Sequence, residues 1–119
     1  MLAYLGDGVI EILVREKLVK SGNIPPERLH STSLLFVRAT EQSKAVERIL
    51  PHLSETELDV YKRGRNAKSR VPKSSSAADY HRATGMECLF GYLYLSENNA
   101  RIKELFEIAF GESFDTISI

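Results

Sequence analysis

The sequence has little of several features that would place it in a specialised class of protein. It contains one cysteine, Cys88, which excludes an internal disulfide and a cysteine-based zinc site. No stretch approaches the roughly 18 uninterrupted apolar residues of a membrane-spanning helix, and the first residues lack the basic segment of a signal peptide. The 119 residues carry no net charge and are 43% hydrophobic, which fits one compact domain. We therefore expect a soluble cytoplasmic protein with Cys88 as a small core residue.

The zero net charge hides an uneven distribution. Between residues 61 and 82, seven basic residues stand against one acidic residue, so this segment carries +6 and the rest of the chain −6. The basic residues are Lys62, Arg63, Arg65, Lys68, Arg70, Lys73 and Arg82. Such a patch is typical of proteins that bind a polyanion such as nucleic acid, although a solvated loop has the same composition.

The pattern of apolar residues predicts helices and no strands. The sequence lacks an Asn-Gly hairpin turn and any sustained alternation of apolar and polar residues. Gly22 is a C-cap candidate, and Ser54 with Glu57 is typical of a capping box. The expected helices span residues 2–20, 33–50, 54–62, 78–95 and 98–111, with a short helix opened by Pro25 and Pro26 and a loop at 64–76. We predict an all-α fold with one domain over residues 1–111 and a frayed tail at 112–119.

Two carboxylates lie in the two most apolar stretches of the chain. Asp7 lies in YLGDGVIEILV and Glu87 in MECLFGYLYL. An ionised carboxylate is expensive to bury unless a cation or hydrogen-bond donors replace the lost water. The same stretches place Gly6, Gly8 and Gly91 inside expected helices, where each costs about 1 kcal/mol relative to alanine. Small residues let two helices cross closely, and a crossing there would bring Asp7 and Glu87 together.

Two carboxylates that meet repel each other unless one is protonated or a cation lies between them. Ligation by oxygen alone favours Mg²⁺, which takes one or two carboxylates, several waters and a substrate phosphate. The alternative is structural: Asp7 caps the first helix near its N-terminus and Glu87 pairs with an arginine. The pattern alone leaves both interpretations open. His30, His52 and His81 show no metal-ligand spacing, so we expect ordinary surface or core roles for them.

These segments together resemble the ribonuclease III family. YLGDGVIEILVREKL and GMECLFGYLYL are similar to the two signature segments of its catalytic domain. KRGRNAKS, followed by VPK, resembles the Mini-ribonuclease III branch, which has no attached double-stranded-RNA-binding domain. The resemblance extends over residues 2–110. It implies a helical bundle of the ribonuclease III catalytic type, a homodimer, and magnesium-dependent cleavage of double-stranded RNA in the maturation of precursor 23S ribosomal RNA.

The resemblance also implies roles for individual residues. Asp7 matches the metal-binding, catalytic aspartate of the first segment, and Glu87 matches the corresponding glutamate of the second. Two further acidic positions of full-length ribonuclease III hold Ala3 and Thr84, as in the Mini branch, and Glu41 is offset by one residue from another. The residues expected to contact RNA are Lys62, Arg63, Arg65, Asn66, Lys68, Arg70 and Lys73.

The implied reaction is phosphodiester hydrolysis that leaves a 5′-phosphate and a 3′-hydroxyl. Two other classes stay open. A non-catalytic helical RNA-binding module would keep the basic segment without requiring both acids, and a helical protein-interaction domain would hold its acids in salt bridges. A ribosomal protein that presents the substrate is a further candidate partner.

Overall fold

The computed structural model describes residues 1–22, 24–68, 70–73 and 75–115. In these residues the chain forms six α-helices, one 3-10 turn and no strand, which confirms the predicted all-α fold. The elements are α1 (Leu2–Ser21), α2 (Pro26–Val37), α3 (Ala39–Ile49), η1 (Leu50–His52), α4 (Glu55–Asn66), α5 (Ala77–Leu95) and α6 (Asn99–Asp115). No helix within the described ranges combines the length and apolar character needed to cross a membrane.

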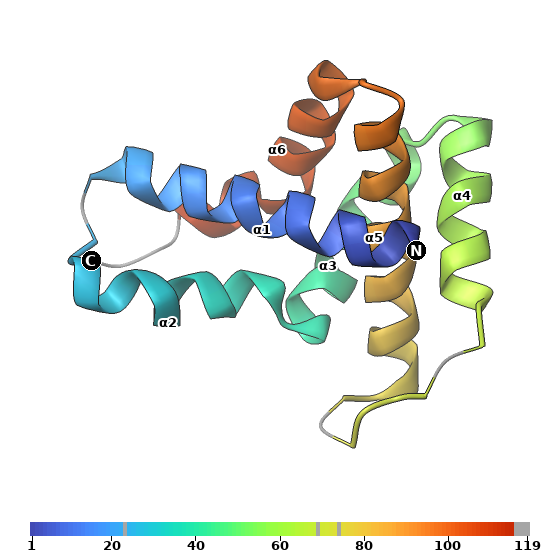
Figure 1. The fold of residues 1–119 in the computed structure, drawn as a ribbon, viewed down its shortest axis with the longest axis horizontal. Coiled ribbons are helices and arrows are strands. Elements are labelled where there is room, and N and C mark those ends of the chain that lie inside the picture. Colours follow the sequence, from blue (N-terminus) through green and yellow to red (C-terminus); the bar gives the residue numbers. More distant parts are fainter. Residues whose placement is uncertain (23, 69, 74, 116–119) are drawn as a thin grey trace.

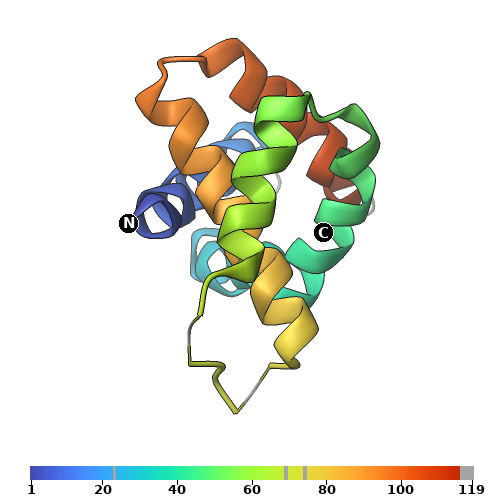
Figure 2. The ribbon, with the colours of Figure 1, turned by 90° about the vertical axis from the view of Figure 1, so that its right-hand side faces the viewer.

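Helix α5 lies at the centre of the bundle. It contacts α1, α3, α4 and α6, and its fully buried side chains include Met86, Leu89 and Phe90. α1 crosses α5, whereas α4 runs alongside it (Figures 1 and 2). α1 and α2 form a hairpin that projects away from α5, to the left in Figure 1. A helix covered on several sides buries apolar residues around most of its circumference, which explains why residues 78–95 are so apolar.

Several predicted helix ends are confirmed. Gly22 ends α1 in the left-handed conformation, with φ of 70°, and its N–H donates to the Val19 carbonyl. Ser54 and Glu57 form the predicted capping box, with bonds of 3.2 and 2.8 Å. Asn98, the first residue of the last predicted helix, accepts a hydrogen bond through its side-chain oxygen from the backbone N–H of Arg101, in the first turn of α6. These caps depend on residues close together in the sequence, which is why they could be predicted.

The single helix predicted over residues 33–50 is instead two helices. Arg38 is extended, with φ of −66° and ψ of 146°, and separates α2 from α3. The side-chain amide of the buried Gln42 donates to the Val37 carbonyl at 3.3 Å, which helps to fix the end of α2. No glycine or proline lies between residues 33 and 50 to signal this break. The break lets α2 pack on α1 while α3 packs on α5 and α6.

The last helix also continues beyond its predicted end. α6 passes through Gly111 and reaches Asp115. Phe114, in this extension, stacks on Phe36 with ring centroids 4.2 Å apart, and Phe36 packs edge-on against Phe110. This aromatic contact gives the chain a reason to stay helical past the glycine. The remainder of the predicted tail, residues 116–119, lies outside the described residues.

Helix α4 ends at Asn66 rather than near Lys62, because Gly64 serves packing and not termination. A Cβ atom on Gly64 would lie 2.7 Å from both the Cβ and the Sγ of Cys88. The absence of a side chain therefore lets α4 approach α5 closely. Cys88 is a half-buried free thiol at this contact, where burial raises its pKa.

Candidate metal and nucleic-acid site

Helices α1 and α5 touch at their glycines. A Cβ atom on Gly6 would lie 1.6 Å from the carbonyl oxygen of Glu87, and one on Gly91 would lie 2.2 Å from the carbonyl oxygen of Leu2. Only glycine permits such an approach of two backbones, and the contact offsets the low helix propensity of these residues. Gly8 differs, because a Cβ atom there would have nothing within 4 Å.

Asp7 and Glu87 meet beside this crossing. Asp7 is exposed on α1, and Glu87 is half-buried on α5. Burial, the negative charge of Asp7 and a hydrogen bond between the two side chains raise the pKa of Glu87 from 4.5 to about 8, with burial the largest cause. At neutral pH, and without a cation, the pair therefore retains a proton. The structure brings together the two acids that the sequence singled out.

The structural alternative, in which Asp7 caps α1 and Glu87 pairs with an arginine, does not agree with the described residues. Met1 is the N-cap residue of α1, and Asp7 lies more than one turn inside the helix. The causes that act on the pKa of Glu87 are burial and Asp7, with no arginine among them. The two carboxyls are thus a pair of like groups, an arrangement that is costly unless a proton or a cation is shared.

The donor set fits a hard divalent cation. The pair supplies oxygen ligands only, and Mg²⁺ commonly takes one or two carboxylates and completes its shell with water and phosphate oxygens. Within residues 1–115, apart from the three not described, no cluster of three or more His, Cys, Asp or Glu side chains is placed to hold a metal. A cation at this pair would keep most of its coordination positions for water and substrate.

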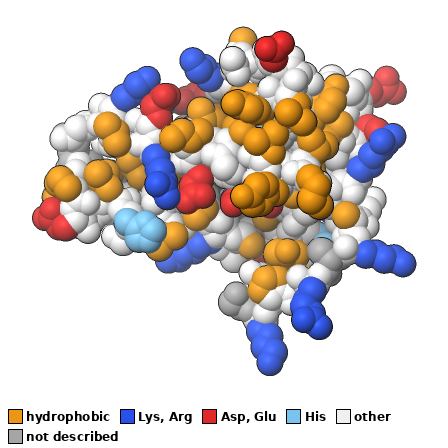
Figure 3. Space-filling view, in the orientation of Figure 1, with side chains coloured by type: hydrophobic (Ala, Val, Ile, Leu, Met, Phe, Trp, Pro, Cys, Tyr) orange, Lys and Arg blue, Asp and Glu red, His pale blue; other side chains and the backbone are white. Residues whose placement is uncertain are grey.

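The predicted RNA-binding residues lie in the last turns of α4 and in the connector, residues 67–76, that leads to α5. Lys62, Arg63, Asn66, Lys68, Arg70 and Lys73 are exposed. Figure 3 shows basic side chains projecting from the lower edge of the molecule, where Figure 1 places this connector. Arg65 is half-buried: its guanidinium lies 5.7 Å from the centroid of the Tyr61 ring, and its Nε donates to Asn66 Oδ1 at 3.1 Å.

Arg82 does not belong to this cationic surface, although it was counted with the basic segment. Its Nη1 donates to Ser43 Oγ at 3.2 Å and lies 3.6 Å from a carboxylate oxygen of Glu47. Both partners are on α3, so Arg82 ties α5 to α3. This role of Arg82 depends on the direction in which its side chain leaves the helix. A count of charges along the sequence does not reveal that direction.

Known proteins are similar to this chain in sequence and in fold. Residues 1–98 match the family model described as Ribonuclease III domain. The chain belongs to the ribonuclease III family. Curated relatives within the family carry the name Mini-ribonuclease 3. One from Symbiobacterium thermophilum is 44% identical over 109 residues, covering 91% of this chain and 84% of the relative. Another, from Desulfitobacterium hafniense, is 46% identical, covering 89% of this chain and 68% of the relative.

These relatives confirm the Mini-ribonuclease III branch that the sequence resembled. An X-ray crystal structure of a protein from Fusobacterium nucleatum has a similar fold, with a TM-score of 0.83 and 28% sequence identity. The similarity covers 90% of this chain and 88% of the Fusobacterium chain. The helical bundle is therefore that of a ribonuclease III domain.

The other positions compared with ribonuclease III do not add a carboxylate to the pair. Ala3 and Thr84 are half-buried, and the Thr84 hydroxyl donates to the Tyr80 carbonyl at 3.0 Å. Glu41 lies on α3, where it forms an ion pair with Lys44 at 3.4 Å. In this ribonuclease III domain the candidate metal site thus consists of Asp7 and Glu87.

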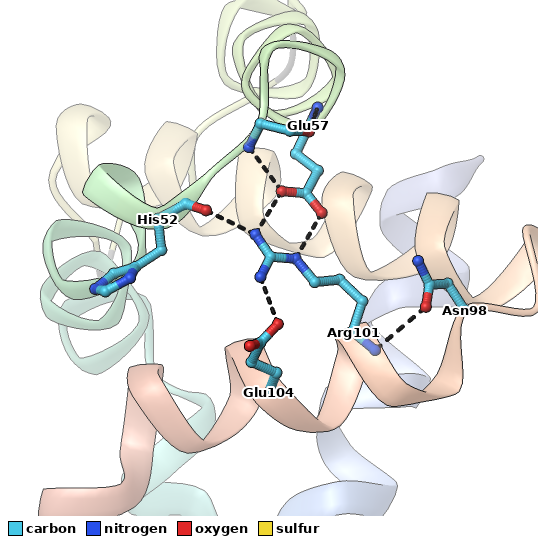
Figure 4. Close-up of polar contacts among 6 residues, drawn as sticks. His52, Glu57, Asn98, Arg101 and Glu104 are labelled. Carbon is cyan, nitrogen blue, oxygen red and sulfur yellow. Dashed lines mark hydrogen bonds and ion pairs between the residues drawn. The ribbon is translucent and has the colours of Figure 1, made fainter.

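Sequence reasoning missed the arginine that fixes the start of α4 (Figure 4). The Nε and Nη2 of Arg101 each donate to a carboxylate oxygen of Glu57 at 2.8 Å, and Nη2 also donates to the His52 carbonyl at 2.6 Å. Arg101 further pairs with Glu104. The hydrogen bond from Arg101 is the main reason why the pKa of Glu57 is lowered. Glu57 was predicted as a capping residue, but its partner lies 44 positions away, beyond the reach of any local pattern.

Proposed function

We propose that this chain is an endoribonuclease that hydrolyses double-stranded RNA with Mg²⁺ held by Asp7 and Glu87. The observation that supports the proposal most directly is the contact between these two carboxyls at the glycine crossing, where the pKa of Glu87 is raised to about 8. A carboxyl held in such surroundings is poised to exchange its proton for a cation. The names of the relatives, all ribonucleases, support the same activity.

In the proposed reaction, water adds to the phosphorus of a phosphodiester, the bond from phosphorus to the 3′ oxygen breaks, and that oxygen takes up a proton. The products are a 5′-phosphate and a 3′-hydroxyl. Mg²⁺, when bound, would polarise the phosphate and lower the pKa of water. The half-buried Glu87 would fix the position of the cation, because its backbone is held against Gly6. The exposed Asp7 would face the substrate side.

The connector would bind the phosphates of the duplex. A-form RNA presents a wide, shallow minor groove, so recognition would depend mainly on shape and on contacts to phosphates and 2′-hydroxyls. Arg65 is already oriented by Tyr61 and Asn66, which reduces the conformational entropy lost on binding. The exposed lysines of the connector would contribute charge and a steep dependence on salt. The proposed natural substrate is precursor 23S ribosomal RNA, and a ribosomal protein would be a candidate for presenting it.

The proposed enzyme is a homodimer. Large apolar side chains are exposed along one side of α1 and at the end of α5: Tyr4 is 87% exposed, Ile12 62% and Leu95 64%. Figure 3 shows hydrophobic side chains gathered over this part of the molecule. Gly8 lies between Tyr4 and Ile12 on successive turns with open space around it, which would let a second chain approach closely. A twofold dimer would place two acid pairs on one duplex, one for each strand.

One experiment separates the enzyme from its alternatives. Wild-type protein, Asp7→Asn and Glu87→Gln are incubated with a long RNA duplex, with and without Mg²⁺, beside the control Glu16→Gln, which removes an exposed acid elsewhere on α1. We expect cleavage only with Mg²⁺, an activity loss of at least about a hundredfold in the two site variants, and no loss in the control. Wild-type binding without cleavage would favour the RNA-binding module, and absence of both would favour the protein-interaction domain.

The dimer has its own test. Sedimentation analysis should show a dimer for the wild type and a monomer for Tyr4→Ser combined with Ile12→Ser. The control Leu35→Ser changes an apolar side chain that is 44% exposed on α2, away from the proposed interface, and should leave the dimer intact. A monomeric wild type, or a control that dissociates as readily, would overturn this interface.

A further inference from the structure

A cleft between α1 and α2 lies away from the connector, at the end of the molecule where these two helices form a hairpin (Figure 1). It has a volume of about 310 Å³ and is lined by Arg15, Leu18, Val19, Pro26, Leu29, His30 and Ser33. Arg15 and His30 are both exposed, and they are the lining residues whose side chains can carry a positive charge. The floor of the cleft is mostly apolar, so these two side chains supply its means of binding an anion.

The cleft is connected to the acid pair along α1. Asp7, Glu11 and Arg15 occupy successive turns, and a rise of 1.5 Å per residue places Arg15 about 12 Å from Asp7 along the helix axis. Arg15 Nη2 donates to Glu11 Oε1 at 3.0 Å, which holds the guanidinium on this side of the helix. Figure 3 shows basic, acidic and histidine side chains side by side over α1 and α2. A polar track thus runs from the acid pair to the cleft.

A nucleic-acid strand that reaches the acid pair must continue on both sides of it. The connector supplies cations on the side of α4 and α5, and the cleft lies on the side of α1 and α2 (Figure 1). A guanidinium has five N–H donors, and the bond to Glu11 uses one of them. The remaining donors of Arg15 are free to form charge-assisted hydrogen bonds with phosphate oxygens, which are among the stronger polar contacts.

We propose that Arg15, assisted by His30, binds a phosphodiester group beyond the scissile one, on the side of the acid pair away from the connector. Arg15 is in this sense a positioning residue, since it holds the strand across the acid pair rather than touching the reacting atoms. The inference rests on the proposed function and adds to it a second contact region for the substrate. Together, the cleft and the connector would fix the direction of the duplex across the site.

The first test compares matched variants in the cleavage-deficient Glu87→Gln background, where binding is measured without turnover. Arg15→Gln should weaken duplex binding about tenfold and reduce the slope of log affinity against log salt by about one. The control Lys20→Gln removes a cation with the same i, i+4 pairing on α1, to Glu16 at 3.6 Å, and should change affinity less than twofold. His30→Gln should weaken binding more than His52→Gln, which removes an exposed histidine of η1.

The second test uses duplexes shortened from either end relative to the cleavage position. A phosphate contact on one side predicts that the effect of Arg15→Gln disappears when that side is trimmed and persists when the other side is trimmed. A merely structural role would give equal losses with every duplex, and that result would overturn the proposal. Should Arg15→Gln fail to fold, as judged by circular dichroism, the same series with His30→Gln decides.

The possible results distinguish the proposed phosphate contact of Arg15 from the proposed ribonuclease function on which it rests. If the wild-type protein cleaves duplex RNA but Arg15→Gln binds it as well as Lys20→Gln does, the proposed contact in the cleft is overturned and the proposed function is not. Wild-type protein that neither binds nor cleaves duplex RNA overturns the proposed function and the cleft contact together.

Discussion

The raised pKa of Glu87 predicts how the stability of the metal-free protein depends on pH. In the unfolded chain this carboxyl has its ordinary pKa of 4.5, whereas in the folded protein the pKa is about 8. The folded state therefore holds the proton more tightly than the unfolded state between these values. The stabilisation of the folded state by this tighter proton binding is complete below about pH 4.5 and is lost as the pH rises to about 8.

The expected size follows from the same two values. A difference of about 3.5 pKa units, at 1.36 kcal/mol per unit, corresponds to at most about 5 kcal/mol of unfolding free energy. This is a large part of the 5–15 kcal/mol typical of a whole domain, so the effect should be measurable without subtle analysis. Mg²⁺ should reverse the loss above pH 8, because a cation replaces the proton that the pair gives up.

The assay is urea unfolding followed by circular dichroism between pH 5 and pH 9, with EDTA or with Mg²⁺, for wild type and Glu87→Gln. Subtracting the variant removes the contributions of the titrating groups that do not interact with Glu87. We expect the unfolding free energy of the wild type to fall steadily, relative to that of Glu87→Gln, as the pH rises. The corresponding fall should be smaller for Asp7→Asn. A difference that stays constant from pH 5 to pH 8 would refute the reasoning. Equal stabilisation of wild type and Glu87→Gln by Mg²⁺ would place the metal elsewhere.

Three further predictions concern packing, ion pairing and RNA binding. Gly6→Ala should lower the unfolding free energy by more than about 3 kcal/mol in urea titrations, because its Cβ would collide with backbone of α5 that cannot swing aside. Arg101→Gln should cost about 3 kcal/mol by leaving a buried carboxylate without its cation, whereas Arg63→Gln, in an exposed pair, should cost less than about 0.5 kcal/mol in the same measurement. Lys68→Glu should weaken duplex binding at moderate salt more than Lys103→Glu on α6, and equal affinities would remove the connector from the RNA site.

Helix ends were predictable where their cause is local and unpredictable where it is distant. The capping box at Ser54 depends on residues three positions apart, and it was found from the sequence. The break at Arg38 has no local signal, since it follows from the directions in which α2 and α3 pack. Phe114 likewise extends α6 only because Phe36 lies opposite in the folded chain. The same reasoning explains why Arg101 was missed.

The candidate site also has features that the sequence indicated and features that depend on the folded chain. The sequence singled out Asp7 and Glu87 because each is a carboxylate among apolar residues, beside glycine in a helix. It allowed the two side chains to meet, but the pattern alone left the structural alternative open. The cationic side chains could be counted from the sequence, but their directions could not. Arg82 points to α3, and Arg15 lines a cleft with His30 that only the pairing of α1 and α2 creates.

The glycines and the acids of this site depend on each other. For this reason we expect changes that stabilise the metal-free fold here to lower the proposed activity. Gly6 lets the backbone of α1 touch that of α5 at Glu87, and the contact that results buries the Glu87 carboxyl next to Asp7. Relieving the repulsion with Glu87→Gln should stabilise the metal-free protein at high pH while abolishing the proposed cation site. On the proposed function, this unfavourable pair of carboxyls would become favourable when a divalent cation, and with it a phosphate group, binds at the crossing.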